Sequence, residues 1–229
     1  MQGIVIQGPT NYWDQVIEAY KDIPNVVWST WEDEPKENIK NIEQYIPTIL
    51  SSKPSFPGHL NVNMQAVSTF KGAEYLESRG VTEILKVRGD VKIKNLKKLM
   101  TCLKGKEMAF LAICKKGVRT DIYYELEYPH YSHDYPPDQV IYGSTLNITN
   151  AFNFQIEEML PIPPESLIAY SFLTSKGETF LLDYEYFKEK NVYFYMKDCI
   201  ENNVELFLVK EKYKFDLVTI HNSEQYYNF

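Results

Sequence analysis

The sequence lacks the features of a secreted or membrane-spanning protein. No apolar run in its 229 residues approaches the roughly 20 residues that a helix needs to cross a bilayer. The first residues show no basic segment followed by a long apolar stretch. The three cysteines, Cys102, Cys114 and Cys199, are scattered, and no pair has zinc-finger or redox spacing. We therefore expect a soluble protein in a reducing, cytoplasmic setting.

Positive charge is also scarce. The chain has 24 lysines and arginines against 31 acidic residues, a net charge of −7, which argues against nucleic acid or an anionic membrane as the partner. A polyphosphate ligand stays open, because a local cationic pair or a bound metal ion is enough to hold it. Internal repeats, low-complexity tracts and Gly/Ser-rich linkers are absent as well. Residues 1–229 are therefore expected to form one domain.

Strand-like and helix-like patterns alternate through the first half of the chain. Apolar and β-branched runs predict strands at residues 3–7, 25–30, 83–88 and 108–113, and a shorter one within 46–58. Strands that alternate with helices build an α/β fold, with a mostly parallel central sheet flanked by helices. Ligands of such sheets bind beyond the carboxyl ends of the strands. That rule directs attention to residues 8–10, 30–34 and 89–90.

Helices are predicted between these strands and again in the second half. Asn11 is a candidate cap for the first helix, and shorter helices are expected from Asn95 and at residues 164–174. Residues 61–79 give the clearest helical pattern, with Gly80 placed to end it. One face of that helix is apolar, and another carries Asn61, Gln65, Ser68, Thr69 and Gly72.

Tyrosine is the residue type in clear surplus, with 18 copies. Its ring stacks on polar rings and its hydroxyl forms hydrogen bonds, so the surplus suits a site for sugars or bases, although a tyrosine-rich core explains it equally well. Residues 123–142 concentrate tyrosines, histidines and prolines and are expected to form an aromatic loop region. We expect Tyr131, His133 and Tyr135 to line an acceptor groove there.

Charged side chains gather where the predicted strand 83–88 ends. Alternate residues of a strand point to one face, and here those residues are Lys86, Arg88 and Asp90. A buried sheet has no structural use for such a group, whereas a diphosphate site does. The carboxylate is a hard ligand for Mg²⁺ or Mn²⁺, and the cations neutralise phosphate oxygens. An internal Arg88–Asp90 salt bridge at a solvated strand end is the alternative interpretation.

Four segments of the first half, taken together, resemble the WavE lipopolysaccharide-synthesis family. They are IVIQGPT (4–10), VWSTWE (27–32), NMQAVSTFKG (63–72) and LKVRGD (85–90), in the family's order and at similar spacing. Two later segments match further blocks of the family. In HDYPPDQVIYG (133–143), Asp138 precedes a short strand, and in IPPE (162–165), Glu165 opens a helix. The resemblance spans residues 3–175.

This resemblance implies a GT-A-type glycosyltransferase with a nucleotide-diphospho-sugar donor and a surface-polysaccharide or glycoprotein-glycan acceptor. We expect hexosyl or deoxyhexosyl transfer with inversion, residues 1–115 binding the donor and 116–229 the acceptor. The chain departs from the family pattern at two positions. Gln139 follows Asp138 where an aromatic residue is usual, and Arg88 stands where the first acid of an Asp-x-Asp pair belongs. The second departure bears on the divalent cation, Mn²⁺ or Mg²⁺, that this kind of transferase uses.

On the matching positions, the donor is expected to contact three strand ends and helix 61–79. Gly8 lets the backbone approach the nucleotide closely. Trp31 stacks on the base or ribose, or else is a packed core indole. Gln65 and Thr69, one helical turn apart, hold ribose or diphosphate, or else form only a polar helix face. The full donor-binding set is Gln7, Gly8, Pro9, Thr10, Thr30, Trp31, Glu32, Gln65, Thr69, Lys86, Arg88 and Asp90.

An inverting transfer to a hydroxyl also needs a carboxylate base. Asp138 and Glu165 are the candidates. Each has a structural alternative, because Asp138 suits a turn, and Glu165 follows Pro164 in a first helical turn, where an acid complements the helix dipole. His221 is a candidate metal ligand beside Asp90, or else a surface histidine.

Two other functions compete with glycosyl transfer. A sugar-nucleotide nucleotidyltransferase has a similar architecture but needs a longer, Gly-rich and cationic loop than Gly8-Pro9-Thr10 after the first strand. A non-catalytic carbohydrate-binding protein does not need Lys86, Arg88 and Asp90 at a strand end. Binding of nucleoside diphosphates separates the lectin from the transferase.

Overall fold

The computed structural model describes residues 1–93, 96–105, 108–110, 138–157, 164–175, 206–208, 216–219 and 226–228. Its strands are β1 (Gln2–Gln7), β2 (Val26–Trp31), β3 (Thr48–Ser51), β4 (Glu83–Arg88), β5 (Val91–Ile93), β6 (Met108–Phe110), β7 (Val140–Ser144), β8 (Leu206–Leu208), β9 (Asp216–Thr219) and β10 (Tyr226–Asn228). Its helices are α1 (Trp13–Tyr20), α2 (Lys36–Ile42), α3 (Val62–Ser78), α4 (Leu96–Leu103), α6 (Thr145–Phe152) and α7 (Pro164–Ser175), with a 3-10 turn η1 (His59–Asn61) before α3. None of the helices in these segments is long and apolar enough to cross a membrane.

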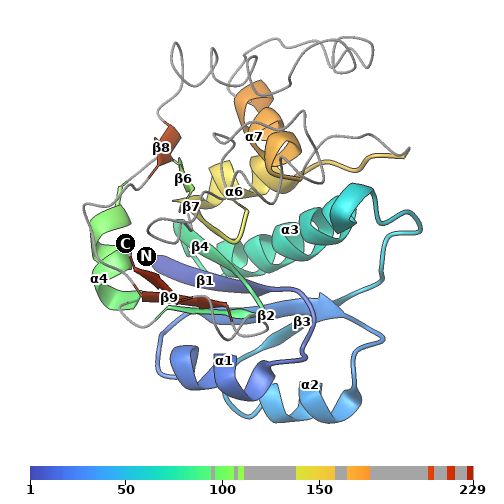
Figure 1. The fold of residues 1–229 in the computed structure, drawn as a ribbon, viewed down its shortest axis with the longest axis vertical. Helices are drawn as coiled ribbons and strands as arrows, with labels where there is room; N and C mark the ends of the chain where they lie inside the picture. The colour runs from blue at the N-terminus through green and yellow to red at the C-terminus, as the bar shows by residue number, and fades with distance from the viewer. Residues whose placement is uncertain are drawn as a thin grey trace.

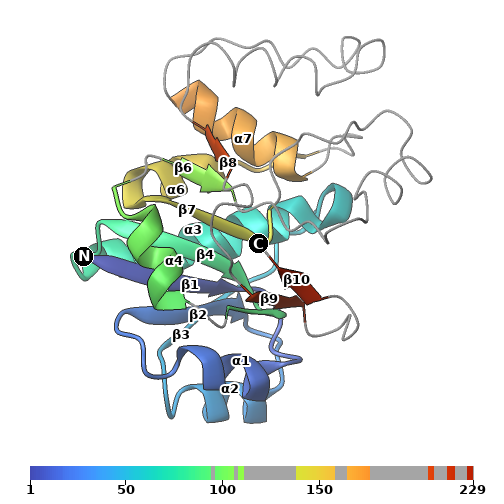
Figure 2. The ribbon, with the colours of Figure 1, turned by 60° about the vertical axis from the view of Figure 1, so that its left-hand side comes forward.

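A mixed sheet in the strand order β3-β2-β1-β4-β7-β6-β8 forms the centre of the fold (Figure 1). Strands β3, β2, β1 and β4 run parallel, whereas β7 is antiparallel to β4 and to β6. A smaller sheet, β10-β9-β5, lies beside it (Figure 2). The α/β fold with a mostly parallel sheet, predicted from the alternating pattern, is confirmed.

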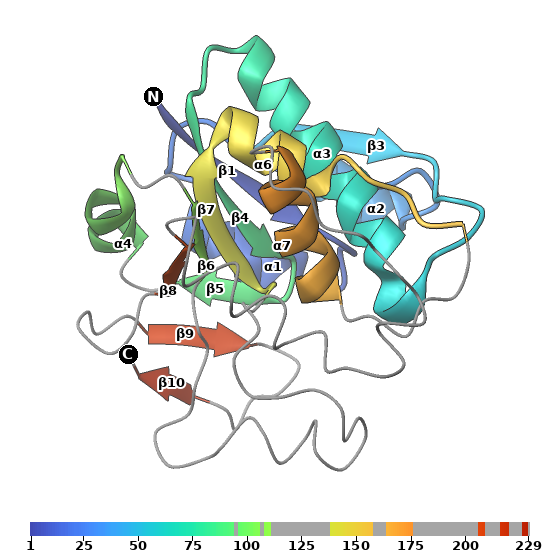
Figure 3. The ribbon, with the colours of Figure 1, turned by 90° about the horizontal axis from the view of Figure 1, so that it is seen from above.

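Helices cover both faces of the main sheet, as the view from above shows (Figure 3). On one face, Ile4 and Ile6 of β1 cluster with apolar residues of α1 and α4. On the other, Val5 clusters with residues of α3, α6 and α7. Because side chains alternate along a strand, Gln7 at the end of β1 shares the face of Val5. Its register partners, Ser29 on β2 and Arg88 on β4, lie beside it at the carboxyl edge.

The first half of the chain agrees with the predicted strands and helices to within a few residues, except at β5, which was not predicted, at the start of α1 and at α2. The cap of α1 is Tyr12 rather than Asn11, and it makes no side-chain capping hydrogen bond. Helix α2 was not predicted at all. It has seven residues, of which only Ile42 is buried, so it shows no apolar stripe in the sequence. A short helix that buries only one side chain has no repeating apolar pattern from which it could be predicted.

Helix α3 ends as predicted but buries most of its polar face. Gly80 follows it in the left-handed conformation, with φ of +78°, as expected of a terminating glycine. Asn61 is exposed and Gln65 is partly exposed, but the rest of that face, Ser68, Thr69 and Gly72, is fully or almost fully buried, like the apolar residues Ala66 and Ala73. The helix lies close over β1 and β2, so small polar side chains fill the layer where large apolar ones do not fit.

Gly72 makes this close packing possible. A Cβ atom there would lie 2.6 Å from Cγ1 of Val5 and 3.1 Å from Cβ of Ser29. We expect Gly72→Ala to lower the free energy of unfolding by about 1–3 kcal/mol, because an added methyl group in a filled core forces strain. Urea denaturation measures this. Glu77→Ala, at an exposed position of the same helix, is the control and is expected to stay within about 0.5 kcal/mol of the wild type. Equal stability of both variants would show that α3 is free to move away from the sheet.

Candidate functional site

A cavity of about 630 Å³ opens at the carboxyl edge of the parallel strands. Its walls come from the loops after β1, β2, β3 and β4 and from the start of α3. The lining residues are Gln7, Gly8, Pro9, Asn11, Tyr12, Trp31, Glu34, Lys53, Leu60, Asn61, Met64, Gln65, Arg88, Gly89 and Asp90. The volume lies within the range of small-molecule sites.

The cavity lies where the chain reverses its direction across the sheet. After β1 the chain moves to β2 on one side, and through α3 it returns to β4 on the other side of β1. Loops that leave two neighbouring parallel strands in opposite directions leave a crevice between them, which is the usual ligand site of an open α/β sheet. Sequence reasoning based on this rule directed attention to the edge where this cavity opens.

Gly89 brings the loops after β1 and β4 into contact. Its N–H donates to the carbonyl of Gln7 at 2.7 Å, and a Cβ atom there would lie only 2.8 Å from the carbonyl oxygen of Pro9. The loop after β1 is held from below by Trp28, whose indole N–H donates to the carbonyl of Gly8 at 3.0 Å. Residues 7–9 and 88–90 consequently form one connected floor.

The charged residues of the floor form an ion pair. Arg88 donates from Nε to Oδ1 of Asp90 at 3.0 Å and from a terminal nitrogen to Oδ2 at 2.5 Å. The side chains are 31% and 15% exposed, respectively. The Arg88–Asp90 salt bridge that stood as the alternative interpretation of this motif is therefore present. Because both residues line the cavity, the salt bridge is compatible with a role of the pair in binding.

The backbone N–H groups of Gly8, Thr10, Arg88 and Gly89 at the floor already have partners. Gly8 donates to the carbonyl of Ser29 at 3.1 Å, and the Gly89 donor is taken by Gln7. Thr10 donates from its backbone and from its hydroxyl to Oε2 of Glu34, at 2.8 and 2.6 Å. Pro9 has no N–H. The loop after β1 thus offers no ring of amides to a phosphate, and charge recognition must come from side chains.

Two glutamines of the cavity lining have buried side-chain oxygens without a hydrogen-bond partner among the described residues. Gln7 is only 6% exposed, and its Oε1 has no hydrogen-bond partner among the described residues. The same holds for the buried Oε1 of Gln65, one of the residues of α3 that lines the cavity. Buried polar atoms normally have a partner, so two such atoms at one cavity indicate a ligand or ordered water.

Aromatic and apolar side chains form another wall. Trp31, 3% exposed, is the last residue of β2, Tyr12 comes from the loop after β1, and Met64 comes from α3. Leu60 stands at the mouth with 49% of its surface exposed and a backbone φ of +49°. A left-handed leucine costs free energy and is typical of a functional position. Beside it, burial lowers the pKa of the His59 imidazole below its usual value of 6.5, so it is neutral at pH 7.

Seven of the twelve proposed donor-binding residues line the cavity: Gln7, Gly8, Pro9, Trp31, Gln65, Arg88 and Asp90. The other five do not. Thr10, Thr30 and Thr69 are completely buried, and Glu32 lies in the same loop as Trp31 but its carboxylate accepts from Ser52 outside the cavity. Their roles remain predictions, and for Thr10 the structure provides a supporting one, the anchoring of Glu34.

Lys86 differs most from its expected place. It is 0% exposed, its ammonium donates to the backbone carbonyl of Asp138, and it lies 5.9 Å from the Phe152 ring centroid. On the sheet its neighbours are Val5 and Ile141, which are both buried. Lys86 therefore lies on the same face of β4 as Arg88 but two residues further from the carboxyl edge. Its hydrogen bond to Asp138 fixes the segment before β7.

Both candidate bases lie toward the cavity edge of the sheet. Asp138 is 4% exposed and directly precedes β7, and the N–H of Arg88 donates to the carbonyl of the next residue, Gln139, at 3.1 Å. Glu165 is the second residue of α7. Two residues later, Leu167 is buried against Val62 at the start of α3. Their role as a base remains a prediction, as do the roles of Tyr131, His133, Tyr135 and His221, which lie outside the described residues.

The residues at the floor do not fit a divalent cation. Both oxygens of Asp90 are bonded to Arg88, and the other carboxylate of the lining, Glu34, is bonded to Thr10. Among the described residues, no group of three His, Cys, Asp or Glu side chains is placed to hold a metal. Each described carboxylate of the lining is therefore engaged by another group of the protein, and too few of them converge to supply the several oxygen ligands of such a cation.

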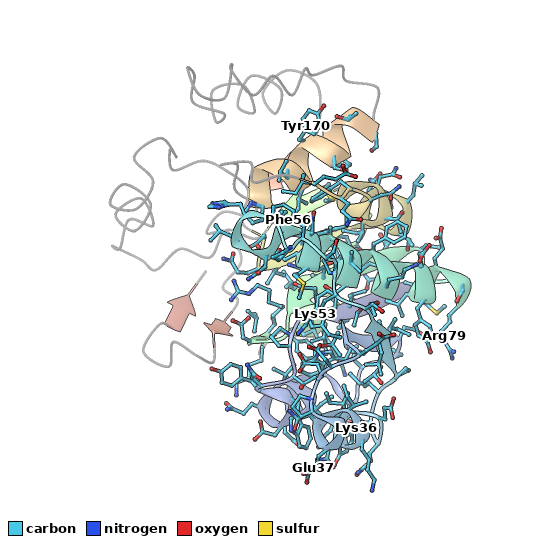
Figure 4. The ribbon with its side chains drawn as sticks, turned by 90° about the vertical axis from the view of Figure 1, so that its right-hand side faces the viewer. Lys36, Glu37, Lys53, Phe56, Arg79 and Tyr170 are labelled. Atoms are coloured by element: carbon cyan, nitrogen blue, oxygen red, sulfur yellow. The ribbon has the colours of Figure 1, made fainter. Side chains whose placement is uncertain are left out.

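Sequence reasoning missed several lining residues, among them Tyr12, Lys53 and Leu60, and it singled out residues 30–34 without giving Glu34 a role. Tyr12 lies two residues after the motif at residues 8–10, so extending that strand-end motif along its loop would have found it. Lys53 and Leu60 come from the proline-containing connection between β3 and α3. Figure 4 labels Lys53 near the middle of the molecule and Arg79 at the far end of α3. No local pattern marks that connection as part of a site.

No family model matches the chain, and no curated protein matches it. Solved structures with a similar fold include TarS 1–349 of S. aureus, with 16% identity and a TM-score of 0.47 over 75% of this chain and 55% of that one. A cytidylyltransferase from Leptospira borgpetersenii has 13% identity and a TM-score of 0.45 over 77% and 72%. The Q189E mutant of LgtC has 13% and 0.42 over 80% and 66%. Likenesses of this size do not assign a function to the chain.

Proposed function

We propose that this protein is a glycosyltransferase that uses a nucleotide-diphospho-sugar donor. One observation carries the proposal. A cavity at the reversal point of an α/β sheet combines a fixed cation, Arg88, with two buried hydrogen-bonding oxygens that lack partners among the described residues, those of Gln7 and Gln65. Ligands of such sheets are commonly nucleotides.

The walls suit the separate parts of such a donor. A diphosphate is complementary to the guanidinium of Arg88. A base or ribose suits the aromatic and apolar wall that contains Tyr12, Trp31 and Met64. The glutamine amides offer both donors and acceptors to polar ring atoms.

The occupied amides of the loop after β1 favour transfer of the sugar over transfer of a nucleotidyl group. A nucleotidyltransferase was expected to hold its triphosphate in a long cationic loop after the first strand. Here the donors of Gly8 and Thr10 are bonded to Ser29 and Glu34, and the loop has no cation. The resemblance to the WavE family supports a surface polysaccharide or a glycoprotein glycan as the acceptor, with inversion at the transferred sugar.

The proposal is tested by a thermal-shift screen with UDP, GDP, CDP, ADP and dTDP, and with free sugars in parallel. One nucleoside diphosphate is expected to stabilise the fold by roughly 2.7 kcal/mol at a hundredfold excess over its Kd. Gln7→Leu should reduce that shift, whereas Gln44→Leu, at an exposed position, should not. A response to sugars alone would identify a lectin and refute the transferase.

A further inference from the structure

We infer that the Arg88–Asp90 pair binds the donor diphosphate directly, without a divalent cation, an inference that rests on the proposed function. Arg88 stands at the position of the first acid of an Asp-x-Asp pair. The structure shows the consequence of having an arginine there. The arginine occupies the carboxylate that a cation would need. The positive charge of the site is then part of the protein itself.

The geometry of the pair fixes the guanidinium. Two of its nitrogen atoms bond to the two oxygens of Asp90, at 3.0 and 2.5 Å. This two-point contact orients a planar group that carries five N–H donors and matches phosphate oxygens in pairs. With its side chain 31% exposed in the cavity wall, Arg88 is partly withdrawn from water, which strengthens its interaction with an anion. Asp90 acts as a positioning residue.

The remaining charges of the lining agree with this assignment. Glu34 is the other carboxylate, and Thr10 holds it with two hydrogen bonds. Lys53 is the second lining cation, and it pairs with Asp33 at 2.6 Å on the exposed rim, where its side chain is 43% exposed. A metal ion at Asp90 would have to break the Arg88 contacts and then face that guanidinium at close range. A diphosphate is complementary in charge to Arg88, and the neighbouring carboxylates of Asp90 and Glu34 are each held by another group.

Calorimetric titration tests the inference, with inorganic pyrophosphate and with the nucleoside diphosphate that gives the largest thermal shift as the two probes. Each is titrated in excess EDTA and again in Mn²⁺. The wild type is expected to bind both probes with equal Kd in the two buffers. Arg88→Met should weaken binding roughly 10- to 100-fold in both, because hydrogen bonds to charged groups contribute that much. Arg88→Lys keeps the charge but loses the paired N–H donors of the guanidinium. Its Kd should therefore lie between those of the wild type and Arg88→Met.

Arg79→Met is the matched control, since Arg79 is an exposed arginine at the other end of α3, stacked on Tyr75 (Figure 4). It should bind both probes like the wild type. Binding by the wild type that disappears in EDTA would overturn the inference and leave the transferase proposal standing. A tightly bound Mn²⁺ in the magnetic resonance spectrum of the wild type, lost in Asp90→Asn, would overturn it as well. Failure of every nucleoside diphosphate to bind in either buffer would refute the proposed function itself.

Discussion

Asp90→Ala is expected to abolish sugar transfer while leaving the fold intact. The carboxylate holds two nitrogen atoms of Arg88, and without it the guanidinium loses its fixed orientation at the floor of the cavity. Misplacement of a charged group by about 1 Å can cost a hundredfold in rate. The measurement is the release of nucleoside diphosphate from the matching nucleotide sugar, together with the melting temperature. More than a tenth of the wild-type activity in Asp90→Ala would remove Asp90 from the site.

Two further variants separate positioning from simple loss of charge. Asp90→Asn keeps the shape and one acceptor oxygen, so it should recover part of the turnover that Asp90→Ala loses. Glu74→Ala is the control. It breaks an ion pair outside the charged motif, Lys71–Glu74 at 2.8 Å on the exposed side of α3. Because exposed pairs contribute only about 0–1 kcal/mol, it should change neither rate nor stability measurably. If Asp90→Asn were as inactive as Asp90→Ala, the full negative charge of Asp90 would be needed for turnover.

The parallel part of the fold was predictable because its signals are local. Each parallel strand of the main sheet is an apolar run, and its end is marked by glycine, proline or a charged residue. Once these strands are assumed parallel, their carboxyl ends must share an edge, so Gln7 and Arg88 were expected to approach each other. They are register partners on β1 and β4. The edge of the sheet therefore follows from sequence alone.

The sequence did not predict how deeply each of these side chains is buried. Alternation placed Lys86 and Arg88 on one face correctly, but the two differ by one full repeat of about 6.6 Å along the strand. Lys86 is thereby enclosed by α6 and β7, whereas Arg88 lies in the cavity wall. Thr69 shows the same effect on α3, where the closeness of the helix to the sheet turns a polar face into a buried one. Burial of this kind depends on contacts between distant segments.

The connection before α3 illustrates the second limit. Lys53 and Leu60 join the cavity because the chain crosses over the sheet after β3, and nothing within that connection predicts where it lies. The left-handed backbone of Leu60 and Asn61, at φ of +49° and +61°, is likewise set by the tertiary structure. Local propensity disfavours that conformation in a leucine, so sequence reasoning had no cause to propose it.

The largest expected effect concerns the base that removes the proton of the acceptor hydroxyl. In an inverting transfer, the hydroxyl attacks from the side of the anomeric carbon opposite the departing diphosphate. With the diphosphate at Arg88, the base has to come from a segment outside the nucleotide-binding loops. Asp138, just before β7, and Glu165, near the start of α7, are acidic residues outside those loops. Asp138 is also fixed in place, because its carbonyl accepts from the buried Lys86.

Neutral isosteres of the two residues distinguish them. Asp138→Asn and Glu165→Gln keep the shape of each side chain and remove its basicity. The variant that lacks the base should turn over roughly 10²- to 10⁴-fold more slowly, the usual contribution of a general base. The Kd for the nucleoside diphosphate should change little, since the base does not contact the nucleotide. The other variant should have nearly wild-type turnover and serves as the matched control. Normal turnover in both would mean that the transfer retains configuration or that its base lies elsewhere in the chain.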